Sequence, residues 1–257
     1  MTDPTLAVLI TYYNERELLT DCLRSVLDQS PRPREIIVYD DASAASAREF
    51  IPEGAPVRLI SGERNIGPGG GRNVLLRAAT SDYVHFQDAD DLLARNWSSA
   101  VLQELRAARP DIVFTEIRAE REGAMVAERV MGIGALAGGA DPIQFGLRGS
   151  LLVPSSTFRR LLALQVGGFH GREVLAQSED FEFHLRLLAA ARSWRVIDQP
   201  LIVQRLREGS HSSRGEADVW RSAAKALAML ADELPPLYRP DVAEAAARVA
   251  ARLYALG

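Results

Sequence analysis

Residues 83–91 read YVHFQDADD, an apolar run that ends in three acidic side chains. Aromatic and β-branched residues predominate in Tyr83 to Gln87, which is typical of a short buried strand. Asp88, Asp90 and Asp91 follow at once. An Asp-x-Asp tripeptide is weak evidence alone, because it occurs by chance in chains of this size, but its place after a strand strengthens it. The stretch therefore predicts a strand whose carboxyl end presents acidic groups.

Three similar runs precede this stretch. Each is aliphatic or β-branched, and they lie at Leu6 to Tyr12, Glu35 to Tyr39 and Val57 to Ser61. The pattern is a strand followed by a helix, three times over, with clear apolar stripes at helical spacing in residues 18–27 and 74–78. Alternating strands and helices of this length predict an α/β fold with a mostly parallel central sheet flanked by helices.

The regular alternation loosens after Pro110. Asp111 to Ile117 predicts another strand, and the charged stretch Arg118 to Glu128 predicts a hairpin or a lid. Six glycines fall within residues 132–149. Glycine lowers the order of a chain, so this segment is expected to be a mobile connection rather than a packed element, and to close over a ligand.

Helical spacing returns in the last hundred residues. It predicts helices at Ser155 to Leu164 and at Glu179 to Ala191, and one or two strands at Trp194 to Arg207. The tail, Asp218 to Leu256, predicts two alanine-rich helices broken at Pro235-Pro236.

Composition excludes several classes of protein. The chain has 257 residues, of which 47% are hydrophobic and 25% charged, with a single cysteine, so it is globular rather than disordered or disulfide-stapled. A net charge of −4 gives no global attraction to nucleic acid. Uncharged runs are too short for a transmembrane helix, and no signal peptide is visible, so we expect a cytoplasmic protein for which peripheral membrane contact stays open.

Polar residues gather where the predicted strands end. Since ligands bind beyond the carboxyl ends of parallel strands, these residues are candidates for a binding site. They are Thr11, Tyr13, Asn14 and Glu15 after the first strand, Asp40, Asp41 and Ser43 after the second, residues 65–73 after the third, and the acidic cluster after the fourth.

Each group also has a plain structural interpretation. Asp41 with Ser43 could cap the following helix, and the glycine run before Arg72 could be only a flexible loop. The glycine run does not fit the dinucleotide fingerprint, because Arg72 holds the last glycine position and the run follows the third strand. A nicotinamide dehydrogenase is therefore disfavoured.

Two carboxylates at positions i and i+2 suit a divalent cation that is bound to a nucleoside diphosphate. Mg²⁺ or Mn²⁺ takes one or two protein carboxylates while phosphates and water complete its shell. Asp90 could hold such a cation while Asp88 accepts hydrogen bonds from a ribose.

Taken together, these motifs resemble the glycosyltransferase family 2 enzymes, which have the GT-A nucleotide-sugar fold. The resemblance covers about residues 6–213, and six motifs occur in the family's order. They are Tyr13-Asn14-Glu15, Asp40-Asp41-Ala42-Ser43, the loop with Asn65, Gly67, Arg72 and Asn73, Asp88 to Asp91, Gly167-Gly168-Phe169 with Glu179-Asp180, and, loosely, Arg207 with His211. The family's frequent proline in the first strand is replaced by Thr11.

The resemblance implies a role for each matching residue. Thr11, Tyr13, Glu15 and Asp41 would hold the base and ribose, with Asp40, Gly67 and Asn73 in the same nucleotide-sugar site. Arg72 would bind the diphosphate and Asp88 the ribose. Asp90 would bind Mn²⁺ or Mg²⁺, and His211 is a second candidate ligand.

The same resemblance places the catalytic base at Asp180 or Glu179. Ser178 is a good helix N-cap, so both acids could instead serve the first helical turn. Adjacent helical residues point about 100° apart, so only one is expected to face the sugar, and Asp180 is preferred over Glu179.

The sequence thus predicts an inverting, metal-dependent glycosyltransferase of polysaccharide biosynthesis that moves a sugar from a nucleotide-diphosphate sugar to an acceptor hydroxyl. Its GT-A domain would span residues 1–215, with a nucleotide-binding half (1–91) and an acceptor half (92–215), and the C-terminal helices (216–257) would pack on the same domain. Two alternatives stay open: a sugar nucleotidylyltransferase, and a non-catalytic nucleotide- or sugar-binding module.

Overall fold

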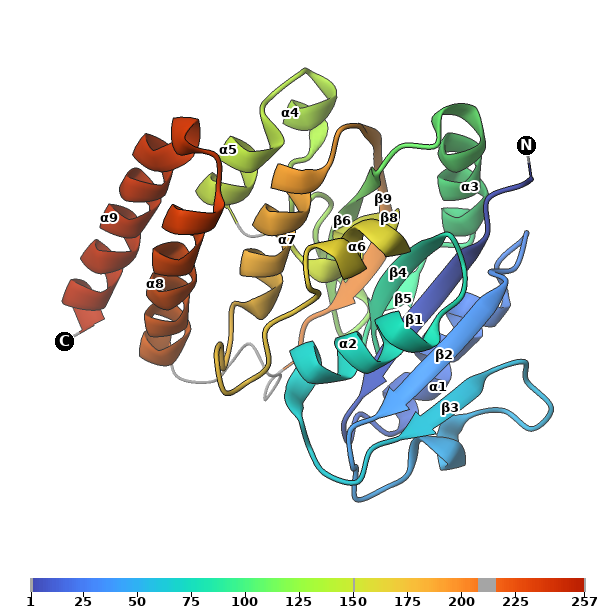
Figure 1. The fold of residues 1–257 in the computed structure, drawn as a ribbon. Coiled ribbons are helices and arrows are strands. Elements are labelled where there is room, and N and C mark those ends of the chain that lie inside the picture. Colours follow the sequence, from blue (N-terminus) through green and yellow to red (C-terminus); the bar gives the residue numbers. More distant parts are fainter. Residues whose placement is uncertain (1, 150, 208–215, 257) are drawn as a thin grey trace.

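The computed structural model describes residues 2–149, 151–207 and 216–256. Its first half alternates strands with helices (Figure 1). The elements are β1 (Leu6–Tyr12), α1 (Glu17–Leu27), β2 (Glu35–Asp40), β3 (Arg58–Ser61), α2 (Gly67–Ala78), β4 (Tyr83–Asp88), β5 (Leu92–Leu93) and α3 (Trp97–Ala108). The predicted strands agree with β1 to β4 within a residue at each end.

The prediction of a helix between β2 and β3 is wrong. The chain makes only a short 3-10 turn, Ala47–Phe50, capped by Ser46. The cause lies at the end of β2, where both carboxylate oxygens of Asp40 accept backbone N–H bonds, from Ser43 and Ala47, each at 2.9 Å. These bonds fold the segment into a tight turn before a helix can propagate.

The second half adds strands that interleave with the first. Its elements are β6 (Ile112–Arg121), β7 (Ala124–Ala127), α4 (Gly134–Ala137), α5 (Pro142–Arg148), β8 (Ser156–Arg159), α6 (Arg160–Gln165), α7 (Glu179–Ala190), β9 (Trp194–Arg205), α8 (Glu216–Glu233) and α9 (Arg239–Leu256). Of the two alternatives for Arg118 to Glu128, the hairpin is present as β6 and β7.

Within the described residues, nine strands form one mixed sheet in the order β3-β2-β1-β4-β8-β6-β9-β5, with β7 paired to β6. The strands β3 to β4 along this order are parallel, whereas β8 is antiparallel to both β4 and β6. The helix predicted over Ser155 to Leu164 is therefore wrong in its first half. Strand pairing on both sides of β8 overrides the local helical spacing.

The glycine-rich segment 132–149 is packed, which corrects the expectation of a mobile connection. It forms α4 and α5, and Leu136 and Ile143 are buried in the core. Gly146 has a packing reason, since a Cβ there would lie 3.0 Å from Leu185 of α7. Glycine here allows two helices to approach closely, and its abundance is not a sign of disorder.

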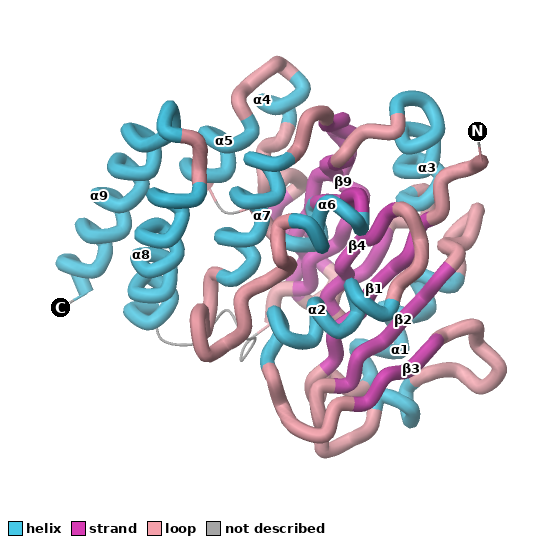
Figure 2. The backbone as a smooth tube through the Cα atoms, in the orientation of Figure 1, coloured by secondary structure: helices cyan, strands magenta, loops and turns pink. Residues whose placement is uncertain are grey.

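Helices cover both faces of the sheet (Figure 2). One buried cluster joins α1 and α3 to the sheet, and the other joins α2, α6 and α7 to the opposite face. The tail forms two helices around Pro235-Pro236 as predicted, and Leu230 of α8 and Val249 of α9 belong to the second cluster. Among the described residues, no helix combines the length and apolar character that crossing a bilayer requires.

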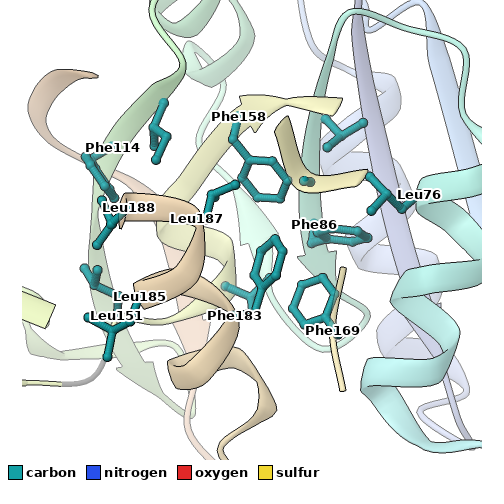
Figure 3. Packing of buried hydrophobic residues seen from close by; sticks show 14 of the residues in the cluster. Leu76, Phe86, Phe114, Leu151, Phe158, Phe169, Phe183, Leu185, Leu187 and Leu188 are labelled. Atoms are coloured by element: carbon teal, nitrogen blue, oxygen red, sulfur yellow. The ribbon is translucent and has the colours of Figure 1, made fainter. Parts of the chain in front are cut away.

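Four phenylalanines pack α7 against β4 (Figure 3). The rings of Phe169 and Phe183 stack with centroids 3.9 Å apart, and Phe169 meets Phe86 of β4 edge to face at 5.3 Å. Phe158 of β8 lies 5.5 Å from Phe183. Aromatic pairs of this geometry stabilise a defined orientation, so this cluster sets the distance between α7 and the end of β4.

Candidate functional site

The carboxyl ends of β1, β2 and β4 meet at one edge of the sheet, where the N-termini of α2 and α7 also open. Thr11 near the end of β1 pairs in register with Asp88 of β4 on one side and Tyr39 of β2 on the other. The polar residues predicted from the strand ends are therefore brought together as expected.

Arg72 of α2 lies between two carboxylates at the centre of this edge. Its Nη1 donates to Oε1 of Glu179 at 2.9 Å, and its Nη2 donates to Oδ1 of Asp88 at 3.2 Å. The Arg72 side chain is only 8% exposed. We call Asp88, Arg72 and Glu179 the ion triad. Arg72 was expected to hold the diphosphate, but its guanidinium is instead buried between the acidic turn and α7.

Burial dominates the electrostatics of the ion triad. Burial raises the pKa of Glu179 to about 7, the neighbouring Asp180 carboxylate adds to this, and Arg72 opposes it. Burial also raises the pKa of Asp88, with Asp90 adding and Arg72 opposing. Removal of these carboxyls from water is thus the largest cause of both pKa shifts, and Arg72 opposes it in both.

Two arginines at the end of β9 hold the acidic turn. The backbone N–H of Arg205 donates to Oδ1 of Asp91 at 2.9 Å, and Nη2 of Arg207 donates to Oδ2 of Asp90 at 2.9 Å. Asp91 is buried, and burial raises the pKa of its carboxyl well above the usual range. Asp91 therefore serves the turn itself, while Asp90 keeps a partly exposed carboxylate.

The loop after β1 lies beside the acidic turn. Glu15 accepts a hydrogen bond from the backbone N–H of Tyr13, and burial, reinforced by Asp90, raises the pKa of Glu15 to about 7. Asn14 and Arg16 both have left-handed backbone, with φ of 65° and 48°. A non-glycine residue rarely adopts this conformation, and such strain gathers at functional sites.

Asp40 and Asp41 act on the backbone of neighbouring loops. Whereas Asp40 holds the turn after β2, the carboxylate of Asp41 accepts from the backbone N–H groups of Ile66 (2.7 Å) and Gly67 (2.8 Å). Asp41 therefore caps the start of α2 rather than a helix of its own segment. Gly67 has a φ of 81° at that position, which a residue with a Cβ would rarely adopt.

Asn73 clamps the glycine turn that precedes α7. Its Nδ2 donates to the carbonyl of Phe169 at 2.7 Å, and its Oδ1 accepts from the Phe169 N–H at 2.9 Å. Gly168 has a φ of 71°, and a Cβ there would lie 2.3 Å from Asn73 Oδ1. The amide of Asn73 is thus engaged with the protein backbone, and it links α2 to the turn that precedes α7.

Asp180 follows Glu179 in the first turn of α7 and is half-buried. The proposed N-cap Ser178 does not cap this helix: it has a φ of 62°, and its side chain makes no cap hydrogen bond. His211, the second candidate metal ligand, lies outside the described residues.

The carboxylates of the acidic turn fit a hard divalent cation. Asp90 presents oxygen ligands, and its charge adds to the burial that raises the pKa values of Asp88 and Glu15. Elsewhere in the described chain, ligand atoms of His170, Glu182 and Glu233 lie within 4.8 Å of one another. There, however, the guanidinium of Arg186 already pairs with both glutamates.

Sequence reasoning missed three contributors to the site. Arg172, in the turn before α7, donates to Oδ1 of Asn65 at 2.6 Å. Arg205 holds Asp91, and His184, buried in α7, contacts the backbone of Asp180. No motif or spacing marks these residues, because their partners are distant in sequence or are backbone atoms.

The buried His184 gives a prediction for pH dependence. Burial lowers its pKa to about 4, whereas an unfolded chain would bind that proton near pH 6.5. Stability that His184 supplies above pH 6.5 is therefore lost as the pH falls towards 4. Relative to His184→Gln, the wild type should lose about 2–3 kcal/mol of unfolding free energy between pH 7 and pH 4. Urea denaturation at both pH values measures this, and a pH-independent difference would contradict it.

A family model described as "Glycosyl transferase family 2" matches residues 7–160, which is more than half of the chain. The chain belongs to glycosyltransferase family 2. The match spans the strands from β1 to β8, which include Asp88 and Arg72 of the ion triad but not Glu179.

Solved structures show the same fold for this family 2 glycosyltransferase. Staphylococcus aureus TarS, in complex with UDP-GlcNAc, superposes with a TM-score of 0.74 at 20% identity, covering 98% of this chain and 73% of that chain. The mannosyltransferase PcManGT of Pyrobaculum calidifontis, in complex with GDP-Man and Mn²⁺, has a TM-score of 0.69 at 19% identity, covering 100% and 77%. The fold is therefore of the GT-A type.

Among curated relatives, the teichoic acid poly(glycerol phosphate) polymerase of Staphylococcus epidermidis is 32% identical over 94 residues. The matched segment is 35% of this family 2 chain and 13% of the polymerase. For three further relatives, the chain likewise spans less than half of the relative's length.

Proposed function

We propose that this family 2 glycosyltransferase is an inverting, metal-dependent enzyme that moves a sugar from a nucleoside-diphosphate sugar to an acceptor hydroxyl. The observation that carries the proposal is the ion triad. Through it, Arg72 ties the Asp-x-Asp turn at the end of β4 to the helix start that holds Glu179 and Asp180. A donor site and a catalytic carboxylate are thereby held at a fixed separation.

On the donor side, we assign the base and ribose to Thr11, Tyr13, Glu15 and Asp41, and the ribose also to Asp88. Tyr13 is 37% exposed at the edge of the site, which suits stacking on a base. Asp40, Gly67 and Asn73 would contribute by shaping the loops they hold. Arg72 would act through Asp88, by fixing and neutralising it, rather than by touching the diphosphate.

We assign the divalent cation, Mn²⁺ or Mg²⁺, to Asp90, with His211 as a further candidate ligand. When bound, the cation would stabilise charge on the departing diphosphate. Mn²⁺ in the PcManGT complex supports a cation of this kind. Asp90 would then exchange its pairing with Arg207 for the metal.

Donor binding should therefore require a divalent cation and Asp90. Two phosphates beside three carboxylates are repelled unless a cation offsets their charge. Calorimetry with UDP or GDP should show binding in Mn²⁺, and none in chelator or in Asp90→Ala. Asp28→Ala, at the exposed end of α1, is a matched control for removal of one acid. Undiminished binding in chelator would remove the metal from the proposal.

On the acceptor side, Asp180 is the proposed general base. Direct displacement that inverts the anomeric centre needs a carboxylate on the face opposite the diphosphate, close enough to take the acceptor's proton. Asp180 is half-buried and has no side-chain partner other than backbone in the described residues. Glu179 is committed to Arg72, which favours Asp180 for this role.

The relatives guide the acceptor class and the cellular setting. The S. epidermidis relative is named for a teichoic acid polymer, so we propose an acceptor hydroxyl in a glycan or cell-surface polymer precursor, and a reaction on the cytoplasmic side. We also propose that residues 1–215 form the GT-A domain, with its nucleotide half in 1–91 and its acceptor half in 92–215. Residues 216–257 would then be a helical appendage.

One assay separates this proposal from its two alternatives. The protein is incubated with Mn²⁺, a panel of UDP-, GDP-, CDP- and dTDP-sugars, mixed acceptors and, in a parallel reaction, pyrophosphate, and the products are followed. A transferase releases nucleoside diphosphate. A nucleotidylyltransferase consumes pyrophosphate, and a non-catalytic module does neither. Absence of nucleoside diphosphate release with every donor would overturn the proposed function.

A further inference from the structure

Helix α7 begins without an ordinary cap. Ser178 is left-handed and makes no cap hydrogen bond, and three acids occupy the first turn. Adjacent residues on a helix differ by about 100° in direction, so the roll of α7 about its axis decides whether Asp180 or Glu179 faces the sugar. Arg72 holds Glu179 at the first turn, and a second contact further along α7 would complete the lock on this roll.

His184 is placed to do so. It lies four residues after Asp180, on nearly the same face of α7, and is 1% exposed. Its Nδ1 lies 2.9 Å from the carbonyl of Asp180, and its Nε2 lies 2.8 Å from Oγ of Ser156 in β8. A carbonyl only accepts, so Nδ1 carries the proton, and the Ser156 hydroxyl donates to Nε2.

Ser156 continues the connection across the sheet. Its carbonyl lies 3.2 Å from Nδ1 of His85, a fully buried residue of β4. The other ring nitrogen of His85 lies 3.2 Å from the side-chain amide of Gln87, next to Asp88. A buried polar chain thus runs from α7 through β8 to the residue before Asp88, and such chains are rigid when every member is satisfied.

We propose that His184 is a positioning residue for transfer: its bond to Ser156 locks the roll of α7 and so aims Asp180, not Glu179, at the acceptor. This inference rests on the proposed role of Asp180. The bond to the Asp180 carbonyl stays within one helix, so it sets the imidazole tautomer but cannot fix the helix against the sheet. Of the two imidazole bonds, only the one to Ser156 joins α7 to a second element.

Two amide substitutions separate these bonds. In His184→Gln the amide reaches the place of Nε2 and can keep the Ser156 bond. In His184→Asn it reaches only the place of Nδ1 and loses that bond. We expect kcat for transfer to fall at least tenfold in His184→Asn and in Ser156→Ala. His184→Gln should restore most of it, and the Kd for nucleoside diphosphate with Mn²⁺ should stay within twofold in all three.

A double-mutant cycle then tests whether His184 acts through Asp180. In an Asp180→Asn background, His184→Asn should lower the single-turnover rate by less than twofold. A full tenfold loss there, or equal rates for His184→Asn and His184→Gln, would overturn the proposal. Ser156→Ala removes one hydroxyl and keeps the fold testable if His184→Asn unfolds. Failure of the proposed function would be seen separately, as normal transfer by Asp180→Asn alone.

Discussion

Asp180→Asn should lower the transfer rate at least about a hundredfold, since a general base is typically worth ~10² to 10⁴ in rate. The substitution keeps the shape of the side chain and removes the charge that, in our proposal, takes the acceptor's proton. Nucleoside diphosphate affinity should stay within a few-fold, because the expected donor contacts lie at the ends of β1, β2 and β4. The measurement is a single-turnover assay with a donor identified in the panel, together with calorimetry.

Glu179→Gln is the matched control for this prediction. It removes the adjacent carboxylate but leaves Asp180 intact, and its effect should come through the lost partner of Arg72. If Asp180→Asn turns over normally while Glu179→Gln is inactive, the two roles must be exchanged. If both variants remain active, neither residue is the base.

Arg72→Met should lower the free energy of unfolding by about 3–5 kcal/mol, the usual cost of removing one partner from a buried ion pair. Methionine fills similar volume beside Phe169, but it leaves the carboxylates of Glu179 and Asp88 without their shared cation. Since Asp88 is 35% exposed and solvent screens part of its charge, the lower end of this range is expected. Urea denaturation of both proteins at pH 7.5 measures the loss.

The double variant Arg72→Met/Glu179→Gln should recover part of the lost stability, because it removes one of the two uncompensated charges. Arg77→Met, at an exposed position of the same helix, is the control for an arginine that contacts no carboxylate in the described residues. A loss below 1 kcal/mol in Arg72→Met, equal to that of Arg77→Met, would show that the ion triad does not hold α2 to α7.

Much of the fold could be predicted from the sequence because periodicity reports burial directly. The runs that became β1, β2 and β4 are mostly aliphatic or aromatic, and the acidic turn follows β4 as expected. Strand β8 could not be predicted, since four residues carry little periodicity and its two neighbours in the sheet come from distant segments. The glycines of 132–149 led to a wrong prediction of mobility, because their composition does not show that Gly146 packs against Leu185.

The candidate site divides in the same way. Acidic residues at strand ends could be predicted because their place depends only on chain direction. The hydrogen-bond partners of these side chains could not be predicted, since Arg72 pairs with a residue 107 positions away. Likewise the Asn73 amide binds backbone atoms of Phe169, and backbone groups leave no signature in a sequence.

The insertion of β8 between β4 and β6 bears on how the protein folds. A fragment that ends at residue 91 would keep the parallel strands. It would leave unpaired the edge of β4 that bonds to β8, and it would expose Phe86. Exposed strand edges of this kind pair with other chains. We therefore expect the nucleotide half to aggregate when it is expressed alone, and the described chain to unfold in one cooperative transition. The two halves of the candidate site would then form together, in a single folding event.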